Sequence, residues 1–355
     1  MDAMQHQRRL FVFYLVPDFT MLALTSAIES LRLANTVLGY DAYAWRVASA
    51  DGNRVRSSCG LSIEPDCSIA AERSALSTLS RPGMAIVAAG RNVEKHMDRS
   101  AEAWLRECGR RGVKIGSLCT GAYLLARAGL LDGKRCTMHW ENLPGFVERF
   151  SNVTVTTRIY EIDDNIYTCA GGTAAVDMML HLIGQDFGDR IVASVSEQAL
   201  MDRVRCSSDR QRLPLSARLG SSHPAVLRVV EEMEAHLAEP LALSELAAHA
   251  GLSRRQIERL FRQEMKRSPA RYYLEVRLER ARLLLTQTAL PIVDIAIACG
   301  FVASSHFSKC YREMYGCAPH ETRARNDDVR PYETQTEPGR ASDRPSRLSS
   351  EPVAA

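Results

Sequence analysis

The sequence lacks the features that mark membrane, secreted and metal-binding proteins. Its longest apolar run, residues 10–17, is far shorter than the ~20 residues that cross a bilayer. No charged-then-apolar leader with a cleavage site opens the chain. The ten cysteines form no C-x-x-C pair and have no histidines at zinc spacing, so we expect free thiols, no bound metal and no other cofactor. These absences favour a cytoplasmic protein that makes no contact with a membrane.

A formal net charge of only +3 conceals a local concentration of basic side chains. Residues 1–220 hold 26 Lys and Arg against 24 Asp and Glu, whereas residues 253–282 hold 10 against 4. Such a cluster suits a surface that contacts DNA phosphates. A basic helix is often only a solvated face, so the interpretation depends on the pattern around it.

Short apolar runs and helical patterns alternate through the first two hundred residues. The predicted strands are 10–16, 45–49, 84–88, 113–118, 153–156 and 166–169, and the predicted helices between them are 21–35, 98–111, 120–128 and 173–187. Apolar runs without alternation, each followed by a helix, predict an α/β fold with a parallel sheet covered on both faces. From residue 224 to 323 every apolar pattern is helical, which predicts an all-α second domain.

Two segments of the second half repeat one plan, in which a short helix, a tight turn and a second helix with a polar outer face follow each other. Gly251 and Gly300 stand at the two turns, where a positive φ is expected. Ser253 and Gln256 form a capping box that predicts a helix from Arg254. Both segments therefore predict helix-turn-helix units.

A rigid spacer is predicted between the two units. Ser268 and Pro269 are typical of a helix start, and the pattern continues to Gln287, a length of about 27 Å. That length lets the two outer helices enter successive major grooves about 34 Å apart on one face of DNA.

These residues resemble the AraC/XylS DNA-binding domain over residues 223–325. The resemblance rests on Ser268-Pro269-x-x-Tyr272-Tyr273-Leu274, Arg277-Leu278-x-x-Ala281, Ile295-Ala296-x-x-x-Gly300-Phe301, Ser305-His306-Phe307-Ser308 and Gly316-x-x-Pro319. It implies that helices at 254–263 and 304–315 read the major groove of double-stranded promoter DNA. The implied DNA contacts are Arg254, Arg255, Glu258, Arg259, Arg262, Ser304, Ser305, His306, Ser308 and Lys309. Arginine suits guanine, and glutamate can accept from cytosine N4.

In the first half, residues 116–122 (Gly-Ser-Leu-Cys-Thr-Gly-Ala) join an apolar strand to a helix. This segment has the character of a nucleophile elbow, with Cys119 on the turn. A helix N-terminus is expected to lower the pKa of the thiol and to offer backbone N–H groups to an anion. Gly171, Gly172 and Thr173 form a second strand-to-helix junction with further donors.

Together with Ala126-x-Ala128-Gly129-Leu130-Leu131-x-Gly133 and His139-Trp140, the elbow resembles the PfpI-like branch of the class I glutamine amidotransferase-like fold. Joined to an AraC-type half, it resembles GlxA-type regulators, and residues 180–183, 196–197 and 209–212 are similar to those that control arginine, carnitine or glycine betaine catabolism. The domains expected are a ligand-sensing domain at 9–205, a linker at 206–222, a DNA-binding domain at 223–325 and a disordered tail at 326–355. Activation, RNA polymerase as a partner and possible homodimer formation are implied by the family.

The residues around Cys119 favour ligand binding over catalysis. Enzymes of this branch commonly have His after the Cys, where this chain has Thr120, and they present an acid from the loop after the first strand. Asp18 is near that loop, but residues 20–24 contain no acid. A Cys without a positioned base is a poor hydrolytic catalyst. The alternative is a cysteine-dependent hydrolase or amidase with an accessory DNA-binding domain, with His139 as the partner of Cys119. An architectural DNA-binding protein without an effector is a further competitor.

The effector expected at this site is a zwitterion. Backbone N–H groups at Cys119–Gly121 would bind its carboxylate, and aromatic rings or Glu141 would face its cation. The predicted ligand-binding residues are Phe19, Cys119, Thr120, Gly121, Tyr123, His139, Trp140, Gly171, Gly172 and Thr173. Trp140 and Tyr123 are also typical of residues that only pack the core.

Overall fold

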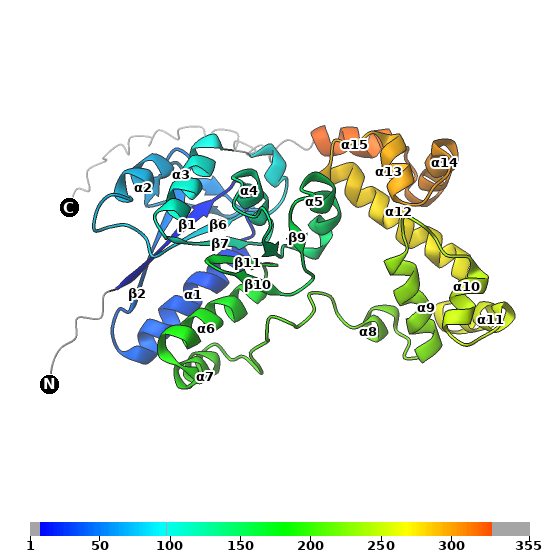
Figure 1. The fold of residues 1–355 in the computed structure, drawn as a ribbon, viewed down its shortest axis with the longest axis horizontal. Coiled ribbons are helices and arrows are strands. Elements are labelled where there is room, and N and C mark those ends of the chain that lie inside the picture. Colours follow the sequence, from blue (N-terminus) through cyan, green and yellow to red (C-terminus); the bar gives the residue numbers. More distant parts are fainter. Residues whose placement is uncertain (1–7, 97, 329–355) are drawn as a thin grey trace, which may run out of the picture.

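The computed structural model describes residues 8–96 and 98–328, which form an α/β domain followed by a helical domain (Figure 1). The disordered tail predicted from residue 326 lies outside the described residues, apart from 326–328 at the end of the last helix. Within the described ranges, no helix is both long and apolar enough to cross a bilayer.

The α/β domain is built on one seven-stranded sheet in the order β10-β11-β7-β6-β1-β2-β5. Its strands are β1 (Arg9–Leu15), β2 (Tyr43–Ser49), β5 (Cys67–Ser68), β6 (Met84–Ala88), β7 (Lys114–Leu118), β10 (Tyr160–Asp163) and β11 (Ile166–Cys169). Its helices are α1 (Met21–Leu38), α2 (Ile69–Ala75), η1 (Val93–Lys95), α3 (Arg99–Arg110), α4 (Ala122–Arg127), η2 (Trp140–Asn142), α5 (Leu143–Arg149), α6 (Ala174–Phe187) and α7 (Asp189–Gln198). Within this sheet, all strand pairs are parallel except β10 with β11.

The central strand β1 shows why the apolar runs do not alternate with polar residues. Phe11 and Phe13 pack into the core shared with α1 and α6, whereas Val12 and Tyr14 pack into the core shared with α3 and α4. Figure 1 shows α1, α6 and α7 on one face of the sheet and α2 and α3 on the other. The prediction of a mostly parallel sheet covered on both faces is confirmed.

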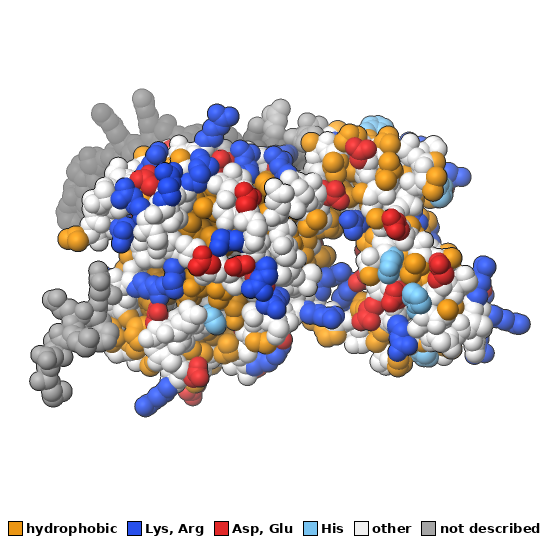
Figure 2. All heavy atoms as spheres, viewed as in Figure 1, with side chains coloured by type: hydrophobic (Ala, Val, Ile, Leu, Met, Phe, Trp, Pro, Cys, Tyr) orange, Lys and Arg blue, Asp and Glu red, His pale blue; other side chains and the backbone are white. Residues whose placement is uncertain are grey.

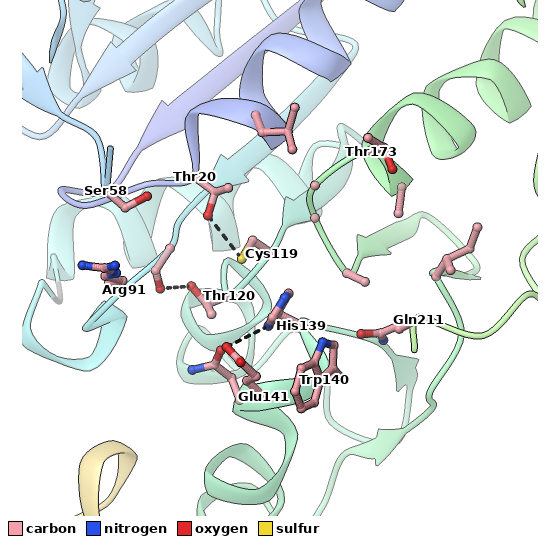
Figure 3. Close-up of a pocket in the computed structure, with 18 of the residues that line it drawn as sticks. Thr20, Ser58, Arg91, Cys119, Thr120, His139, Trp140, Glu141, Thr173 and Gln211 are labelled. Atoms are coloured by element: carbon pink, nitrogen blue, oxygen red, sulfur yellow. Dashed lines mark hydrogen bonds and ion pairs between the residues drawn. The ribbon is translucent and has the colours of Figure 1, made fainter. Parts of the chain in front are cut away.

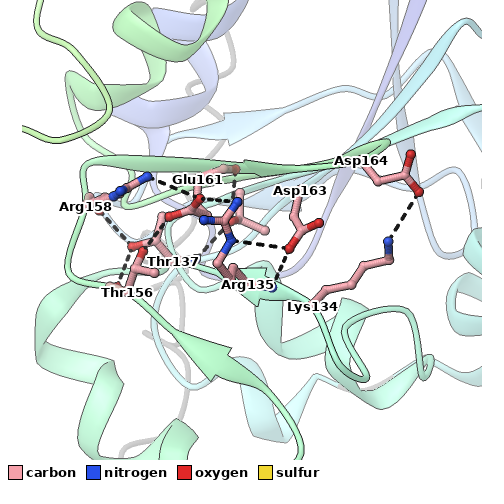
Figure 4. Close-up of polar contacts among 9 residues, drawn as sticks. Lys134, Arg135, Thr137, Thr156, Arg158, Glu161, Asp163 and Asp164 are labelled. Carbon is pink, nitrogen blue, oxygen red and sulfur yellow. Dashed lines mark hydrogen bonds and ion pairs between the residues drawn. The ribbon is translucent and has the colours of Figure 1, made fainter.

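The strand predicted at 153–156 does not join this sheet. Instead, β9 (Thr154–Val155) pairs with β8 (Arg135–Cys136) in a separate two-stranded sheet, and β3 (Val55–Arg56) pairs with β4 (Ser62–Ile63) in another. The edge strand β10 was not predicted, because acidic residues interrupt its apolar pattern. Glu161 of β10 is buried, accepts from Thr156 Oγ1 at 3.0 Å and lies between the guanidinium groups of Arg158 and Arg135 (Figure 4). These partners offset the cost of burying the carboxylate.

The helical domain contains two small bundles. Its helices are α9 (Pro224–Ala235), α10 (Leu243–His249), α11 (Arg254–Met265), α12 (Pro269–Gln287), α13 (Ile292–Ala298), α14 (Ser304–Tyr315) and α15 (Pro319–Asp328). The first residues of α12 belong to the core of α9–α11, and its later residues belong to the core of α13 and α14. The single helix α12 therefore joins the two units, and its bounds match the predicted spacer.

The local signals predicted for this domain are present. The side chain of Ser253 accepts from the backbone N–H of Gln256, whose own side chain accepts from the N–H of Ser253, so the capping box is confirmed. Gly251 and Gly300 have φ values of 68° and 74°. A Cβ at Gly300 would also lie 2.6 Å from Cγ of Pro240, so this turn packs directly on the segment after α9.

The segment between the domains begins as a strap along the α/β domain, formed by residues 205–211. The backbone N–H of Ile159 donates to the carbonyl of Asp209 at 3.2 Å. The side chain of Gln211 donates to Thr137 Oγ1 at 3.0 Å and to the carbonyls of Met138 and Arg158 at 2.9 Å. A short helix, α8 (Leu215–Leu219), follows where no periodic pattern was found.

Candidate functional site

A large pocket lies where the carboxyl ends of the parallel strands meet. Thr20 follows β1, Gly90 follows β6, Cys119 follows β7 and Gly171 follows β11, and all four line it. Its volume is about 750 Å³, within the range of small-molecule sites. Ligands of open α/β sheets bind at this edge, because the loops that follow the strands converge there.

Cys119 has the strained backbone of a nucleophile elbow. Its φ is 59°, a left-handed value that non-glycine residues rarely adopt. Gly171 packs against the turn so closely that a Cβ there would lie 2.7 Å from the Cβ of Cys119. The hydroxyl of Thr20 donates to Sγ of Cys119 at 3.4 Å (Figure 3). The loop after β1 therefore presents a hydroxyl to the thiol.

The expectation of a lowered thiol pKa at this turn is wrong. Cys119 is 7% exposed, and burial raises the pKa of its thiol above the usual value, because an apolar surrounding disfavours the thiolate. Asp18, the acid nearest the loop, points elsewhere, with Oδ2 3.8 Å from Nε2 of His96. The hydroxyl of Thr120, in the place of the usual His, donates to the carbonyl of Gly90 at 2.6 Å.

One backbone donor of the elbow, the N–H of Gly121, is already occupied. The N–H of Gly121 donates to the carbonyl of Leu118 at 3.0 Å. Gly121 does not line the pocket, and a Cβ there would lie 2.4 Å from the carbonyl oxygen of Val87. The glycine is needed for close packing of the turn on β6. Gly121 is therefore no donor to this pocket, whereas binding of a carboxylate by the N–H groups of Cys119 and Thr120 stays a prediction.

The second strand-to-helix junction is better placed for an anion. Gly171, Gly172 and Thr173 all line the pocket and lead into the N-terminus of α6. Arg205 of the strap also lines it; its Nη2 donates to Thr173 Oγ1 at 2.9 Å and to Oδ2 of the buried Asp177 at 2.6 Å. The positive end of the helix dipole lies at this end of the pocket, beside the guanidinium of Arg205, whose charge is balanced by Asp177.

The predicted segment His139–Glu141 lies beside the elbow, where the N–H of His139 donates to the carbonyl of Cys119 at 3.3 Å. All three of its side chains line the pocket, and Nδ1 of His139 lies 3.8 Å from Oε2 of Glu141 (Figure 3). Burial lowers the pKa of His139, so its ring is mainly neutral at pH 7. One face of Trp140 already carries a protein cation, since the Arg212 guanidinium lies 4.5 Å from the ring centroid.

Two of the predicted aromatic ligands do not line the pocket. The side chain of Phe19 is fully buried in the core with α1. Tyr123 is 5% exposed and packs edge-on against Phe146 and Phe150. Tyr123 thus has the core-packing role that its type also allows, and the prediction of Phe19 as a ligand residue is wrong because its ring belongs to the core. Of the ten predicted ligand residues, the structure brings these together around the pocket: Cys119, Thr120, His139, Trp140, Gly171, Gly172 and Thr173.

Several lining residues were missed by sequence reasoning. They come from segments far apart in the chain: Thr20, Arg91, Glu94, Arg205, Gln211, Thr286 and Gln287. Thr20 and Arg91 could have been suspected because they follow predicted strands. Gln211 lies in the segment 209–212 quoted for the family resemblance, whereas the two α12 residues carry no local signal. Among the described residues, no three His, Cys, Asp or Glu side chains gather as a metal site.

The predicted DNA-reading residues lie on the outer faces of α11 and α14, which are on the side of the helical domain away from the sheet (Figure 1). On α11, Arg254, Arg255, Arg259 and Arg262 are exposed, whereas Ile257 and Phe261 are buried beneath them. Figure 2 shows basic side chains projecting from this edge of the domain. Glu258 is half-buried, and its Oε1 accepts from Nε of Arg254 at 3.1 Å.

On α14, four predicted residues are exposed and one is half-buried. The exposed residues are Ser304, Ser305, His306 and Lys309, and Ser308 is the half-buried one. Phe307 is fully buried in the core. Arg277 of α12, which was not predicted to contact DNA, holds the turn before α14. Its Nε and Nη2 donate to the carbonyls of Cys299 and Gly300, both at 2.7 Å.

Comparison with known proteins agrees with both halves of this description. Residues 11–185 match the DJ-1/PfpI family, and residues 246–325 match a helix-turn-helix domain family. The chain is 44% identical to the HTH-type transcriptional regulator GbdR of Pseudomonas aeruginosa, over 88% of this chain and 83% of GbdR. It is 41% identical to CdhR of the same species, over 88% and 91%, and 35% identical to GlxA of Rhizobium meliloti, over 88% and 95%. Both are likewise HTH-type transcriptional regulators.

Proposed function

Because this chain belongs to the AraC-family helix-turn-helix transcriptional regulators with a DJ-1/PfpI domain, we propose that its pocket binds a small zwitterionic nitrogen compound that controls promoter binding. The observation that carries the proposal is the distribution of charge in the pocket. The N-terminus of α6 and Arg205 lie at one end, and Trp140 with Glu141 lines another part. A carboxylate and a cation would each find a matching partner.

The effector class follows from this arrangement and from the sequence resemblance. Arginine, carnitine and glycine betaine each join a carboxylate to a fixed or persistent positive charge. We propose that the regulated genes serve the catabolism of such a compound and that the output is activation, in contact with RNA polymerase. Homodimer formation on promoter DNA belongs to the same proposal.

We also propose that the protein is not an enzyme. A hydrolytic cysteine must ionise at neutral pH, and Cys119 is buried with a raised pKa. The hydrogen bonds of Thr20 and Thr120 hold the elbow without supplying a base. The strained turn is best explained as a former active site whose loops now enclose a ligand.

The test measures binding of arginine, carnitine and glycine betaine to the full-length protein by calorimetry, and promoter affinity with and without each compound. Amidated analogues, which lack the carboxylate, and neutral analogues, which lack the cation, are the controls. We expect one zwitterion to bind, to change promoter affinity and to exceed both kinds of analogue in affinity. Equal binding of the neutral analogues would refute the two-ended pocket.

A further inference from the structure

The C-terminal end of α12 docks on the α/β domain beside the pocket. Gln287, the last residue of α12, donates through Nε2 to the backbone carbonyl of Glu141 at 2.8 Å. Two turns earlier, Nη2 of Arg280 lies 3.8 Å from Oε1 of Glu148 in α5. Thr286 and Gln287 line the pocket itself. One wall of the pocket therefore belongs to the DNA-binding domain.

A glycine in α5 allows this close approach. Gly145 has ordinary helical backbone, so its own conformation does not require a glycine. A Cβ there would lie 3.0 Å from both Cβ and Oε1 of Gln287, and 3.2 Å from Cγ2 of Thr288. These nearest atoms all come from the end of α12 and the residue after it. The tight fit at this position therefore arises from the contact between the domains, and a side chain here would displace the end of α12.

We propose that the effector binds between the two domains, in contact with Thr286 and Gln287 as well as with the α/β loops. This inference rests on the effector pocket proposed above. The wall formed by α12 exists only when α12 is docked, so the docked arrangement offers the effector more contacts. A ligand that binds one arrangement more tightly shifts the population toward it. Effector binding therefore stabilises the docking of α12.

One short segment serves both the pocket and the interface. The side chains of Trp140 and Glu141 in η2 line the pocket, and the carbonyl of Glu141 holds Gln287. The next helix, α5, begins at Leu143 and carries Gly145. A ligand that fixes η2 on one side therefore fixes the acceptor of the interdomain hydrogen bond on the other, without a long chain of intermediate contacts.

Docking of α12 fixes the position of both helix-turn-helix units, because this helix belongs to the cores of both. Figure 1 shows α11 and α14 on the side of the domain away from the sheet. Docking leaves both reading helices open to DNA and fixes their orientation relative to the α/β domain. The docked arrangement is therefore the one in which the effector can influence promoter binding.

The test uses the full-length protein and three substitutions. Gly145→Leu inserts a side chain into the interface, and Gln287→Ala removes the hydrogen bond to Glu141. Gln198→Ala is the matched control, because Gln198 is the exposed last residue of α7, away from the pocket. Hydrogen exchange of α5 and of the last turn of α12 reports docking without any ligand. Calorimetric titration with arginine, carnitine and glycine betaine reports affinity.

We expect faster exchange in α5 and the last turn of α12 for both interface variants, but not for the control. The compound that binds the wild-type protein should slow exchange in that turn, and should bind both variants about ten-fold more weakly, as expected for loss of one or two polar contacts. Faster exchange in the central sheet of Gly145→Leu would mean that this variant has lost overall stability. In that case, the exchange and the affinity of Gln287→Ala test the proposal.

Two negative results are distinguishable. Equal affinity of a compound for the wild-type protein and for both variants, with docking lost in the variants, would overturn the shared site and leave the proposed effector pocket intact. If none of the three compounds binds the wild-type protein, the proposed effector class is refuted first, and this inference is refuted with it.

Discussion

Replacing Arg277 by Met should loosen the second helix-turn-helix unit and leave the first one in place. The guanidinium of Arg277 donates to the last carbonyls around the turn after α13, at 2.7 Å each, and lies 4.2 Å from the ring centroid of Phe301. A hydrogen bond to a charged group contributes about 1.5–3 kcal/mol, and a cation–π contact about 0.5–2 kcal/mol. Since the freed carbonyls regain water in the opened state, we expect a net loss of about 2–4 kcal/mol in local stability.

Hydrogen-exchange mass spectrometry is the suitable assay, because all three tryptophans lie in the α/β domain and do not report on this unit. A loss of 2–4 kcal/mol corresponds to exchange in α13 and α14 that is about 30- to 700-fold faster. Arg271→Met is the control on the same helix. Its guanidinium pairs with Glu275 on the surface, and such a pair contributes less than about 1 kcal/mol.

Footprinting should then show a protected half-site for α11 and an unprotected one for α14. A rise in exchange of less than about three-fold in α13 and α14 would refute the role of Arg277. An equal rise in α10 and α11 would show that the two units do not open separately.

Three further predictions concern DNA reading and the pocket. Arg259→Ala should weaken cognate-site binding by about 1–3 kcal/mol in a fluorescence-anisotropy titration, and an equal loss on random DNA would reduce Arg259 to a phosphate contact. Cys119→Ser should keep the effector response of a reporter promoter within a few fold of the wild-type response, because the buried thiol stays neutral. Complete loss of the response in a folded variant would mean that thiol chemistry is needed. Trp140→Ala should weaken effector binding by about 2- to 30-fold in calorimetry and leave promoter affinity without effector nearly unchanged. Unchanged effector binding would mean that Trp140 only supports Arg212.

The fold was predictable from the sequence where the signals are local. Buried parallel strands show up as short apolar runs, and the capping box at Ser253 and the proline at the start of α12 mark helix ends within one or two residues. The edge strand β10 was missed because its charged residues are stabilised by partners from other segments, such as Arg135 with Glu161. A pattern within four residues contains no information about those partners.

The pocket was only partly predictable for the same reason. The elbow and the Gly-Gly junction follow strands and could be placed at one edge of the sheet. Burial reversed the expected direction of the pKa shift at Cys119, and burial is a property of the whole fold. Gln287 lies 146 positions along the chain from its partner Glu141, and only the arrangement of the two domains brings these two residues together. The aromatic residues Phe19 and Tyr123 look alike in sequence whether they face a ligand or the core.

The strap at residues 205–211 determines how strong the contact between the domains has to be. Gln211 is tied to the α/β domain, and α8 is held on the helical domain by Leu215 and Leu219, which pack against its core, and by the ion pair of Arg218 with Glu234. Only residues 212–214 therefore remain as a tether. A short tether holds its two ends at an effective concentration on the order of millimolar. An interface with a dissociation constant of about 1 mM, or about 4 kcal/mol, would then be docked half of the time. An effector that prefers the docked form by only about 1.4 kcal/mol would raise the docked fraction from one half to about nine tenths. Among the described residues, the contact consists of one hydrogen bond and one ion pair around a glycine. Such a weak contact leaves the docked fraction near one half without effector, where a small preference of the effector changes it most.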